Sequence, residues 1–393
     1  MKLNILHVVA TPFPANQGTA AAVKELINAL VKRGHEIHIV TYYQGEDTPI
    51  PGVYIHRIPS LGGRRNESFV GFTKKRPLLD LALALKTLQV VRRVRPHVIH
   101  AHHHEGVMAA FLSRIISKIP LIYHCVASME QELPLFVRPS FLLQRIGKLL
   151  DTFVPRLADY CVALSPDLVD NIGMTGFPPE KTFYLPMVVD TSLFREGSGE
   201  KFRDRYRLAN NNIILYTGVV DEFQGLGNLL KSMTIVTKEV PSAKLIIAAT
   251  IFNVNQIKKY RALVQELGLE NFVMFLEDFP FSELPNLLAV ADVTVIPREK
   301  CPGFPMKLLN YMAAGKPIVS MRGSAKILRE GKNGLIADTW EELGEKILVL
   351  LKDKDLSQRL GRAGKLELDR FAPDVVAEKM ERVYISLVRH NNF

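Results

Sequence analysis

The sequence predicts an α/β protein with two doubly wound domains, each a parallel sheet covered by helices. Short apolar runs alternate with amphipathic helical segments along nearly the whole chain, which is typical of parallel sheets with helices on both faces. The alternation stops in a polar stretch at residues 195–212 and then starts again. With 393 residues, the chain also exceeds the size of one ordinary domain.

The first domain is predicted to span residues 1–190. The helix expected after its first strand shows the period clearly, because Val23, Leu26, Ile27 and Leu30 share one face and Gly34 ends it. The expected strands are apolar runs at residues 5–9, 37–42, 53–58, 98–101, 121–124, 160–164 and 183–185.

The second domain is predicted to span residues 191–373. Its expected strands lie at residues 213–218, 244–249, 272–275, 293–297, 318–320 and 335–336. A last helix within residues 374–393 follows Pro373 and can pack back on the first domain or stay with the second. Ligands of open parallel sheets bind at the carboxyl ends of the strands, so two such sheets facing each other would form a ligand cleft.

The composition narrows the classes of partner. The formal net charge of +10, from 50 basic and 40 acidic residues, favours an anionic partner: a phosphate-bearing ligand, an anionic bilayer or a nucleic acid. A nucleic acid is disfavoured, because no recognised binding module is present and the basic residues are not interleaved with a stacking platform. The three cysteines are expected to be buried thiols in a reducing compartment, since Cys125, Cys161 and Cys301 lack metal-ligand spacing.

The chain start is expected to be a strand, because no signal-peptide pattern precedes it. No apolar run approaches the roughly 20 residues that a membrane-spanning helix needs. The sequence therefore predicts a cytoplasmic protein that does not cross a membrane.

A glycine-containing loop follows the first predicted strand. It ends in Gly18 and Thr19 at the start of a helix, where glycine lets a ligand approach and free N–H groups favour an anion. A plain capping turn explains this short pattern about as well.

Histidines gather after the fourth predicted strand, where residues 100–105 read His-Ala-His-His-His-Glu. At least one of them is expected to face the ligand while the others are solvated, and His124 at the end of the next strand can join them. Zinc is disfavoured here, because adjacent histidines do not easily converge on one tetrahedral ion and no cysteine is near.

A third segment, residues 295–319, reads as strand, Gly/Pro loop, helix and strand. Arg298 and Lys307 flank the loop and resemble a clamp for a diphosphate at a helix start. Solvated surface charges are the plainer alternative.

Together these segments resemble family 4 of the retaining glycosyltransferases, which have the GT-B fold of two Rossmann-like domains. The resemblance covers essentially the whole chain. Its marks, in order, are the Gly-Thr loop, the His-x-His after residues 96–99, Leu164-Ser165, Val189-Asp190 with Phe194, Ala291-Asp292-Val293, the segment 295–319, and the stretch 331–335.

The sequence also departs from this family. The two glutamates of the family's paired motif fall at Pro302 and Asn310, and the arginine and lysine that grip the donor phosphates fall at Val219 and Gln224. Residues 216–225 are similar to a divergent branch that carries an arginine after the strand and a Pro-x-Lys before the helix. We therefore expect Arg298 and Lys307 to replace the lost grip, and Asn310 to hydrogen-bond a ribose hydroxyl.

The resemblance implies transfer of a sugar from a nucleotide-sugar donor to an acceptor, with retention and with neither metal nor cofactor. His102 is expected to contact the donor sugar near the reacting centre. The acceptor or cleft residues are expected in the first domain and the donor-binding residues mainly in the second: Gly18, Thr19, His103, His104 and His124 on the acceptor side, and Gly218, Gln224, Arg298, Gly303, Phe304, Lys307 and Asn310 for the donor.

Two alternatives stay open. A nucleotide-sugar hydrolase or epimerase would need a carboxylate for acid–base work, for which Glu105 is the candidate. A non-catalytic nucleotide-sugar or glycan-binding subunit would explain the missing glutamates. The Asp353-Lys354-Asp355 stretch, which matches a metal-binding pattern of another glycosyltransferase fold, is interpreted as a surface coincidence.

The positive charge in the first half suggests peripheral contact with an anionic membrane and a lipid-linked or surface-glycan acceptor. Residues 62–76 combine basic side chains with Phe69 and Phe72. Residues 141–157 predict an amphipathic helix with Arg145, Lys148 and Arg156 opposite its apolar face. The alternative, equally consistent with this helix, is that its apolar face packs on the sheet.

Overall fold

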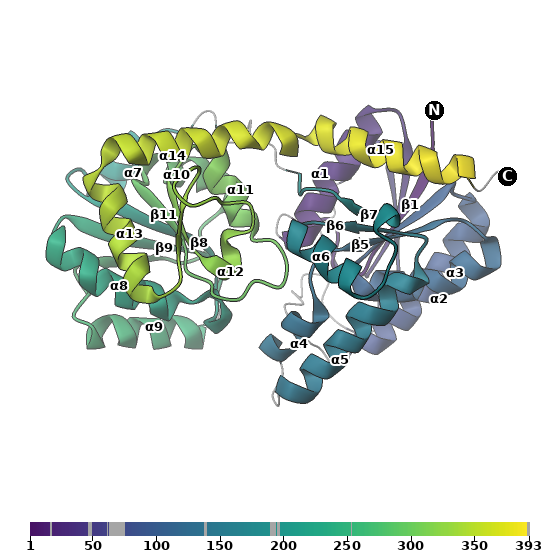
Figure 1. Cartoon of the computed structure of the whole chain (residues 1–393), viewed down its shortest axis with the longest axis horizontal. Coiled ribbons are helices and arrows are strands. Elements are labelled where there is room, and N and C mark those ends of the chain that lie inside the picture. Colours follow the sequence, from purple (N-terminus) through teal and green to yellow (C-terminus); the bar gives the residue numbers. More distant parts are fainter. Residues whose placement is uncertain are drawn as a thin grey trace. The chain divides into compact units, whose positions relative to one another are not determined.

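The computed structural model describes residues 1–15, 18–45, 49–60, 62, 75–136, 140–188, 194, 197–252 and 254–390. The chain divides into two compact units. The first comprises residues 1–188, 302–304 and 370–393, and the second comprises residues 189–301 and 305–369. Each unit is a parallel sheet with helices on its faces, as Figure 1 shows.

The first unit contains a seven-stranded parallel sheet in the order β3-β2-β1-β4-β5-β6-β7. The winding reverses between β1 and β4, which pair directly, so this is the ligand-binding position of a doubly wound sheet. The strands are β1 (Asn4–Val9), β2 (Glu36–Thr41), β3 (Val53–Arg57), β4 (Val98–His102), β5 (Leu121–Cys125), β6 (Tyr160–Ala163) and β7 (Thr182–Tyr184). The helices are α1 (Gly18–Lys32), α2 (Arg76–Val94), α3 (His103–Ser117), α4 (Met129–Phe136), α5 (Ser140–Phe153), α6 (Pro166–Met174) and α15 (Pro373–His390).

The second unit contains a six-stranded parallel sheet in the order β10-β9-β8-β11-β12-β13. Its reversal point lies between β8 and β11. The strands are β8 (Asn212–Val220), β9 (Ala243–Phe252), β10 (Val273–Leu276), β11 (Val293–Ile296), β12 (Ile318–Met321) and β13 (Leu335–Ala337). The helices are α7 (Gly199–Arg205), α8 (Leu226–Glu239), α9 (Val254–Glu266), α10 (Leu284–Val290), α11 (Met306–Ala313), α12 (Arg322–Ala325), α13 (Trp340–Lys352) and α14 (Lys354–Leu366).

The predicted α/β class and every predicted strand are confirmed, with ends that differ by a few residues. The three cysteines are buried free thiols, as expected. The Asp353 carboxylate caps α14 by accepting a hydrogen bond of 2.9 Å from the Leu356 N–H, which explains this aspartate as part of a helix start.

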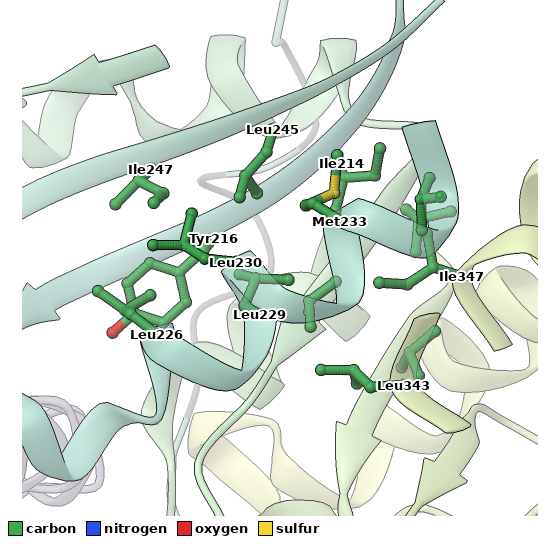
Figure 2. Close-up of a cluster of buried hydrophobic side chains, with 14 of the residues drawn as sticks. Ile214, Tyr216, Leu226, Leu229, Leu230, Met233, Leu245, Ile247, Leu343 and Ile347 are labelled. Atoms are coloured by element: carbon green, nitrogen blue, oxygen red, sulfur yellow. The ribbon is translucent and has the colours of Figure 1, made fainter. Parts of the chain in front are cut away.

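The core of the second unit lies between its sheet and the helices α8 and α13 (Figure 2). Leu226, Leu229, Leu230 and Met233 recur at helical spacing on α8 and are fully buried against the apolar side chains of β8 and β9. The β-branched and leucine-rich strands are buried on both faces, which is the pattern of a parallel sheet covered on both sides.

In the first unit, α1 and α15 pack together on one face of the sheet. Met380 and Tyr384 of α15 are fully buried in the same apolar cluster as Leu26, Ile27 and Leu30 of α1. The C-terminal helix therefore completes the core of the unit that contains the N-terminus. In the described part of the chain, no helix is both long and apolar enough to span a bilayer.

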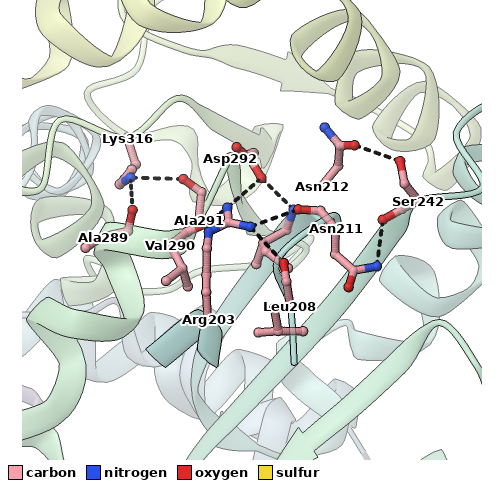
Figure 3. Close-up of polar contacts among 11 residues, drawn as sticks. Arg203, Leu208, Asn211, Asn212, Ser242, Ala289, Val290, Ala291, Asp292 and Lys316 are labelled. Carbon is pink, nitrogen blue, oxygen red and sulfur yellow. Dashed lines mark hydrogen bonds and ion pairs between the residues drawn. The ribbon is translucent and has the colours of Figure 1, made fainter. Parts of the chain in front are cut away.

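A polar network joins the amino ends of β8 and β11 in the second unit (Figure 3). The Asp292 carboxylate accepts hydrogen bonds from the Ile213 N–H at 2.7 Å and from Arg203. Arg203 also donates to three backbone carbonyls, those of Leu208, Asn211 and Val290. Because these groups satisfy one another, the strand starts are fixed at the edge opposite the ligand-binding edge.

We predict that Asp292→Ala destabilises the protein by about 1–3 kcal/mol, because it leaves the Ile213 N–H and the Arg203 guanidinium without their shared acceptor. Urea unfolding of the two proteins measures this difference. Asp355→Ala, at an exposed position on α14, is the control and should change stability by less than about 0.5 kcal/mol. Equal stability of the Asp292 variant and the wild type would contradict a structural role for the network.

Candidate functional site

The loops after β8 and β11 approach each other closely at the reversal point of the second sheet. A Cβ atom on Gly225 would lie 2.2 Å from the Pro297 carbonyl oxygen, and Gly225 has a φ of +72°. Only glycine fits this position, for both reasons. The loop after β8 is therefore held against the residue that precedes Arg298.

Lys307, in the first turn of α11, brings its ammonium group into this region. Its Nζ donates a hydrogen bond of 3.2 Å to Gln224 Oε1 and lies 3.8 Å from the ring centroid of Tyr216. A Cβ atom on Gly218 would lie 3.2 Å from the same Nζ. Three predicted donor-binding residues, Gly218, Gln224 and Lys307, therefore meet at one point.

This arrangement explains how the chain departs from the family pattern at Gln224. The family that the sequence resembles places a lysine at this position. Here an amide occupies it and accepts a hydrogen bond from a lysine that comes from α11 instead. The basic group next to the loop after β8 therefore comes from α11 rather than from the loop itself.

Arg298 supplies a second cation beside the first. Its guanidinium carbon lies 4.8 Å from the ring centroid of Phe223, and its Nε donates to the Lys300 carbonyl at 2.8 Å. Burial, and then the charge of Arg298, hold the pKa of Lys307 well below its usual range. An anion that binds both side chains would favour the charged form of Lys307, so the site is suited to an anion.

The remaining donor candidates divide between the two units. Asn310 follows Lys307 by three residues on α11, so both side chains project from the same side of that helix, and Asn310 is partly exposed. Gly303 and Phe304 group with the first unit. Gly218, Gln224, Arg298, Lys307 and Asn310 lie in the second unit, and the donor-binding role of Gly303 and Phe304 stays a prediction.

Sequence reasoning missed the aromatic residues that support these groups. Tyr216 lies beneath the Lys307 ammonium and donates to the Val219 carbonyl at 2.6 Å. The Tyr311 hydroxyl accepts a hydrogen bond from the Thr217 N–H at 2.9 Å, which fixes the end of β8. Lysine and arginine near aromatic faces gain cation–π attraction, so the pairing of Tyr216 with Lys307 and Phe223 with Arg298 could have been a signal.

In the first unit, the histidines at the carboxyl end of the sheet are not solvated, so that expectation is wrong. His100 and His102 are fully buried, and His7 of β1 and His124 of β5 lie beside them. His102 Nε2 lies 3.0 Å from His7 Nδ1, in hydrogen-bond contact. The predicted donor-sugar contact of His102 stays a prediction, and His102 has no exposed surface here.

His103 begins α3 in a strained backbone conformation, with a φ of +64°. Burial lowers its pKa to about 4, against the opposing effect of Glu105. Glu105 forms an ion pair of 2.9 Å with Arg76 of α2. Burial alone would raise the pKa of Glu105, but Arg76 and His103 outweigh this effect and lower it. Glu105 is therefore an anion near neutral pH, which suits a general base rather than a general acid.

His104 is structural. Its Nε2 lies 2.9 Å from Asp151 Oδ1, and Asp151 also accepts hydrogen bonds from the N–H groups of Met129 and Glu130. His104 and Asp151 thus connect α3, α4 and α5. Sequence position alone does not separate this role from that of His103, because the two residues are neighbours.

Gly18 and Thr19 start α1, as predicted. Thr19 and His124 line a small, mainly apolar pocket in the first unit, together with residues of α1, the ends of β5 and β6, and the segment after β7. Two of the predicted acceptor-side residues therefore share a pocket. Its further lining residues are Ala22, Val23, Leu26, Val126, Leu164, Leu185, Pro186, Met187, Val188 and Val376.

Two family models match the chain, one over each half. The model described as glycosyl transferase 4-like domain matches residues 17–187, and the model described as glycosyl transferases group 1 matches residues 199–367. The chain belongs to the family 4 type of GT-B glycosyltransferases.

Relatives that align over nearly the whole chain are also glycosyltransferases or synthases by name. This glycosyltransferase is 22% identical over 405 residues to N-acetyl-alpha-D-glucosaminyl L-malate synthase of Bacillus anthracis, covering 98% of each chain. It is 23% identical over 387 residues to D-inositol 3-phosphate glycosyltransferase of Thermobispora bispora, covering 93% of this chain and 89% of the relative.

Solved structures share the fold. HepE of Anabaena in complex with UDP aligns with a TM-score of 0.77 and 17% identity over 98% of this chain and 100% of its own. HepE in complex with UDP-glucose aligns with a TM-score of 0.74 and 18% identity, over 97% and 99%. Sucrose-phosphate synthase of Thermosynechococcus elongatus aligns with a TM-score of 0.81 and 17% identity, over 98% and 100%. At these identities the likeness establishes the two Rossmann-like domains.

We predict that this glycosyltransferase takes up protons when a nucleoside diphosphate binds. The depressed pKa of Lys307 rises when an anion adjoins it, so affinity should weaken as the pH rises through the pKa of the free enzyme. Calorimetric titration in two buffers of different ionisation enthalpy measures the uptake.

Lys307→Gln should abolish this uptake. Lys316→Gln is the matched control, because Lys316 is a second lysine whose pKa is lowered by burial, but its Nζ donates to the Ala289 and Ala291 carbonyls at the opposite edge of the sheet (Figure 3). The same uptake in wild type and Lys307→Gln would refute the link between Lys307 and the anion.

Proposed function

We propose that this protein transfers a sugar from a nucleoside diphosphate sugar, bound through its diphosphate by Arg298 and Lys307, to an acceptor. The convergence of Lys307, Gln224 and Gly218 beside Arg298 carries this proposal. Departure of a diphosphate develops negative charge, and two preorganised cations stabilise it. HepE, which shares the fold, has been solved with UDP and with UDP-glucose.

Retention of configuration and a reaction without a metal or cofactor are part of the same proposal. Arg298, Lys307 and the free N–H groups at the start of α11 supply the positive potential that a divalent cation provides to diphosphates elsewhere. Asn310 stands where the family carries a glutamate, and its amide can hydrogen-bond a ribose hydroxyl without charge assistance.

We predict that nucleoside diphosphates raise the melting temperature of the wild type and that Arg298→Ala and Lys307→Ala each weaken binding about 10- to 100-fold, the cost of one charge-assisted hydrogen bond. Titration calorimetry measures the dissociation constants. Lys300→Ala is the control, because Lys300 contributes only its backbone carbonyl to Arg298. Unchanged affinity in both clamp variants would remove the basis of the proposal.

A non-catalytic nucleotide-sugar-binding subunit is the second candidate, favoured by Pro302 and Asn310 at the two glutamate positions. Both candidates bind nucleoside diphosphates. They differ in turnover, so release of nucleoside diphosphate from a panel of nucleotide sugars with lipid and glycan acceptors separates them.

The proposal extends to a lipid-linked acceptor at an anionic membrane surface, because α5 turns its apolar face to solvent. A Cβ atom on Gly147 would lie 2.3 Å from the Met129 carbonyl oxygen, so this side of α5 packs on α4. Leu142 and Leu149, on another side, are 61% and 67% exposed. The alternative in which the apolar face packs on the sheet is therefore wrong.

Helices α2 and α3 of the same unit also expose apolar side chains. These two helices pack against each other, and the His104–Asp151 contact connects α3 to α5. Basic side chains accompany the apolar ones, with the Arg145 guanidinium 4.6 Å from the Phe141 ring centroid. The exposed apolar residues are Leu78, Leu81 and Leu85 on α2, Met108, Leu112, Ile115 and Ile116 on α3, and Phe141, Leu142, Ile146, Leu149 and Phe153 on α5.

This combination fits the boundary of an anionic bilayer, where apolar side chains enter the acyl region and basic ones meet the headgroups. It supports a peripheral site on the inner face of the membrane. The second predicted contact, residues 62–76, lies outside the described residues except Gly62, Lys75 and Arg76, and stays a prediction.

We predict that the protein co-sediments with vesicles of phosphatidylglycerol and phosphatidylcholine, and that Leu142→Gln combined with Leu149→Gln weakens this binding at least about ten-fold through lost apolar burial. Met174→Gln is the control, because Met174 is an exposed apolar side chain on α6 of the same unit. Binding that survives the double substitution would exclude α5 as the docking helix.

A further inference from the structure

Four histidines meet on one face of the first sheet, the face covered by α1 and α15. His7 of β1 is the register partner of His100 in β4, and His102 of β4 is the register partner of His124 in β5. Because side chains alternate along a strand, His100 and His102 point to the same face. Neighbours of this cluster on that face, such as Ile5, Val98 and Ile122, belong to the core formed with α15.

The rings are close enough to share one small ion. The ring centroids of His7, His100 and His102 lie 4.5 to 5.3 Å apart, and one nitrogen from each lies within 4.8 Å of the others. Two nitrogens bound at 2.0–2.1 Å to one tetrahedral ion lie about 3.3 Å apart. The contact of 3.0 Å between His7 Nδ1 and His102 Nε2 is already near this separation, and a nitrogen of His100 lies within 4.8 Å of both rings' ligand nitrogens.

The nitrogens of this cluster are short of partners. His7 Nε2, His100 Nε2 and His102 Nδ1 are buried, with no hydrogen-bond partner among the described residues. An unsatisfied buried polar atom is costly, and coordination of an ion through His100 Nε2 is one way to satisfy it, whereas His7 and His102 meet through their other nitrogens, Nδ1 and Nε2.

We propose that His7, His100 and His102 bind a divalent transition metal ion, with His124 or a water molecule as the fourth ligand. The donors are all imidazoles, which suits Zn²⁺ rather than Mg²⁺ or Ca²⁺. His124 is placed for this role, because its ring centroid lies 4.9 Å from that of His102 and both its nitrogens are buried without a partner among the described residues.

This set differs from the one that the sequence brought to attention. Adjacent histidines do not converge: His104 binds Asp151, and His103 faces Glu105 and Arg76. The converging residues alternate along one strand and add a histidine from the neighbouring strand. A contact outside the cluster orients one ligand, because His100 Nδ1 lies 2.6 Å from the Tyr384 hydroxyl of α15.

The role that follows is structural, because the ligands are fully buried or nearly so. An ion here would hold β1, β4 and, through His124, β5 together at their carboxyl ends, next to the strained His103. The ligands belong to the first unit and the clamp residues to the second. Because His102 is also the residue expected to contact the donor sugar, the metal is assayed by its retention and not by transfer activity.

The test uses the full chain purified without a polyhistidine tag. Protein grown with zinc and passed over a chelating resin should retain about one zinc per chain, and its X-ray absorption spectrum should show nitrogen ligands at about 2.0 Å. Replacement by Co²⁺ should give the visible absorption bands of a tetrahedral site. Removal of the ion should lower the melting temperature.

His7→Gln and His102→Gln should each lose the metal while keeping the far-ultraviolet circular dichroism of the wild type. His56→Gln is the matched control, because His56 and His38 form a similar pair on β3 and β2, with 3.0 Å between their nitrogens, but belong to no group of three such ligands in the described part of the chain. If a variant does not fold, zinc retention and the cobalt spectrum of the wild-type protein test the proposal without it.

Folded wild-type protein that retains less than about one tenth of an equivalent of zinc and gives no cobalt bands would overturn the proposal. Full metal retention in both His7→Gln and His102→Gln would overturn it as well. In either case the cluster would be a network of neutral histidines only.

Discussion

The second unit depends on a positive charge placed where water is scarce. The Lys307 ammonium lies over Tyr216, beside Gln224 and near a second cation, Arg298. Desolvation and like charge both disfavour the charged form, and one amide oxygen with one aromatic face only partly offsets this. The fold tolerates the arrangement because glycines at 218 and 225 leave the space that the cations and the Pro297 carbonyl occupy. An anion beside Lys307 would favour its charged form.

The two glutamates that the family carries, and that this chain lacks, would change the electrostatics of the same site. With Pro302 and Asn310 at the two glutamate positions, no carboxylate from that motif neutralises Arg298 and Lys307. The site keeps a greater positive potential, and its hydrogen bonds to a donor's hydroxyls come from a neutral amide.

At the carboxyl edge of its sheet, the first unit carries buried histidines where the second unit carries Arg298 and Lys307. Neutral, buried histidines fill the space between strands and α15, while the ionised groups, Arg76 and Glu105, pair with each other at the start of α2 and α3. The imidazole rings on adjacent strands stack as phenyl rings do, but their nitrogens still need hydrogen-bond partners. Apolar helices on the outside of this unit then face solvent, which is the feature that most sets it apart from an ordinary enzyme surface.

The sequence alone determined the α/β class, the strands and the candidate cations, because alternation of apolar runs, helical periodicity and Gly/Pro punctuation are local signals. Arg298 and Lys307 were found because they flank a loop at a strand end. Which histidines converge was decided only in three dimensions, since strand register places His7 of β1 beside His100 and His102, nearly a hundred residues away. Exposure of the apolar face of α5 was likewise undecidable from its periodicity, because an amphipathic pattern is the same whether that face meets a sheet or solvent, and only the packing of Gly147 on α4 fixes its orientation.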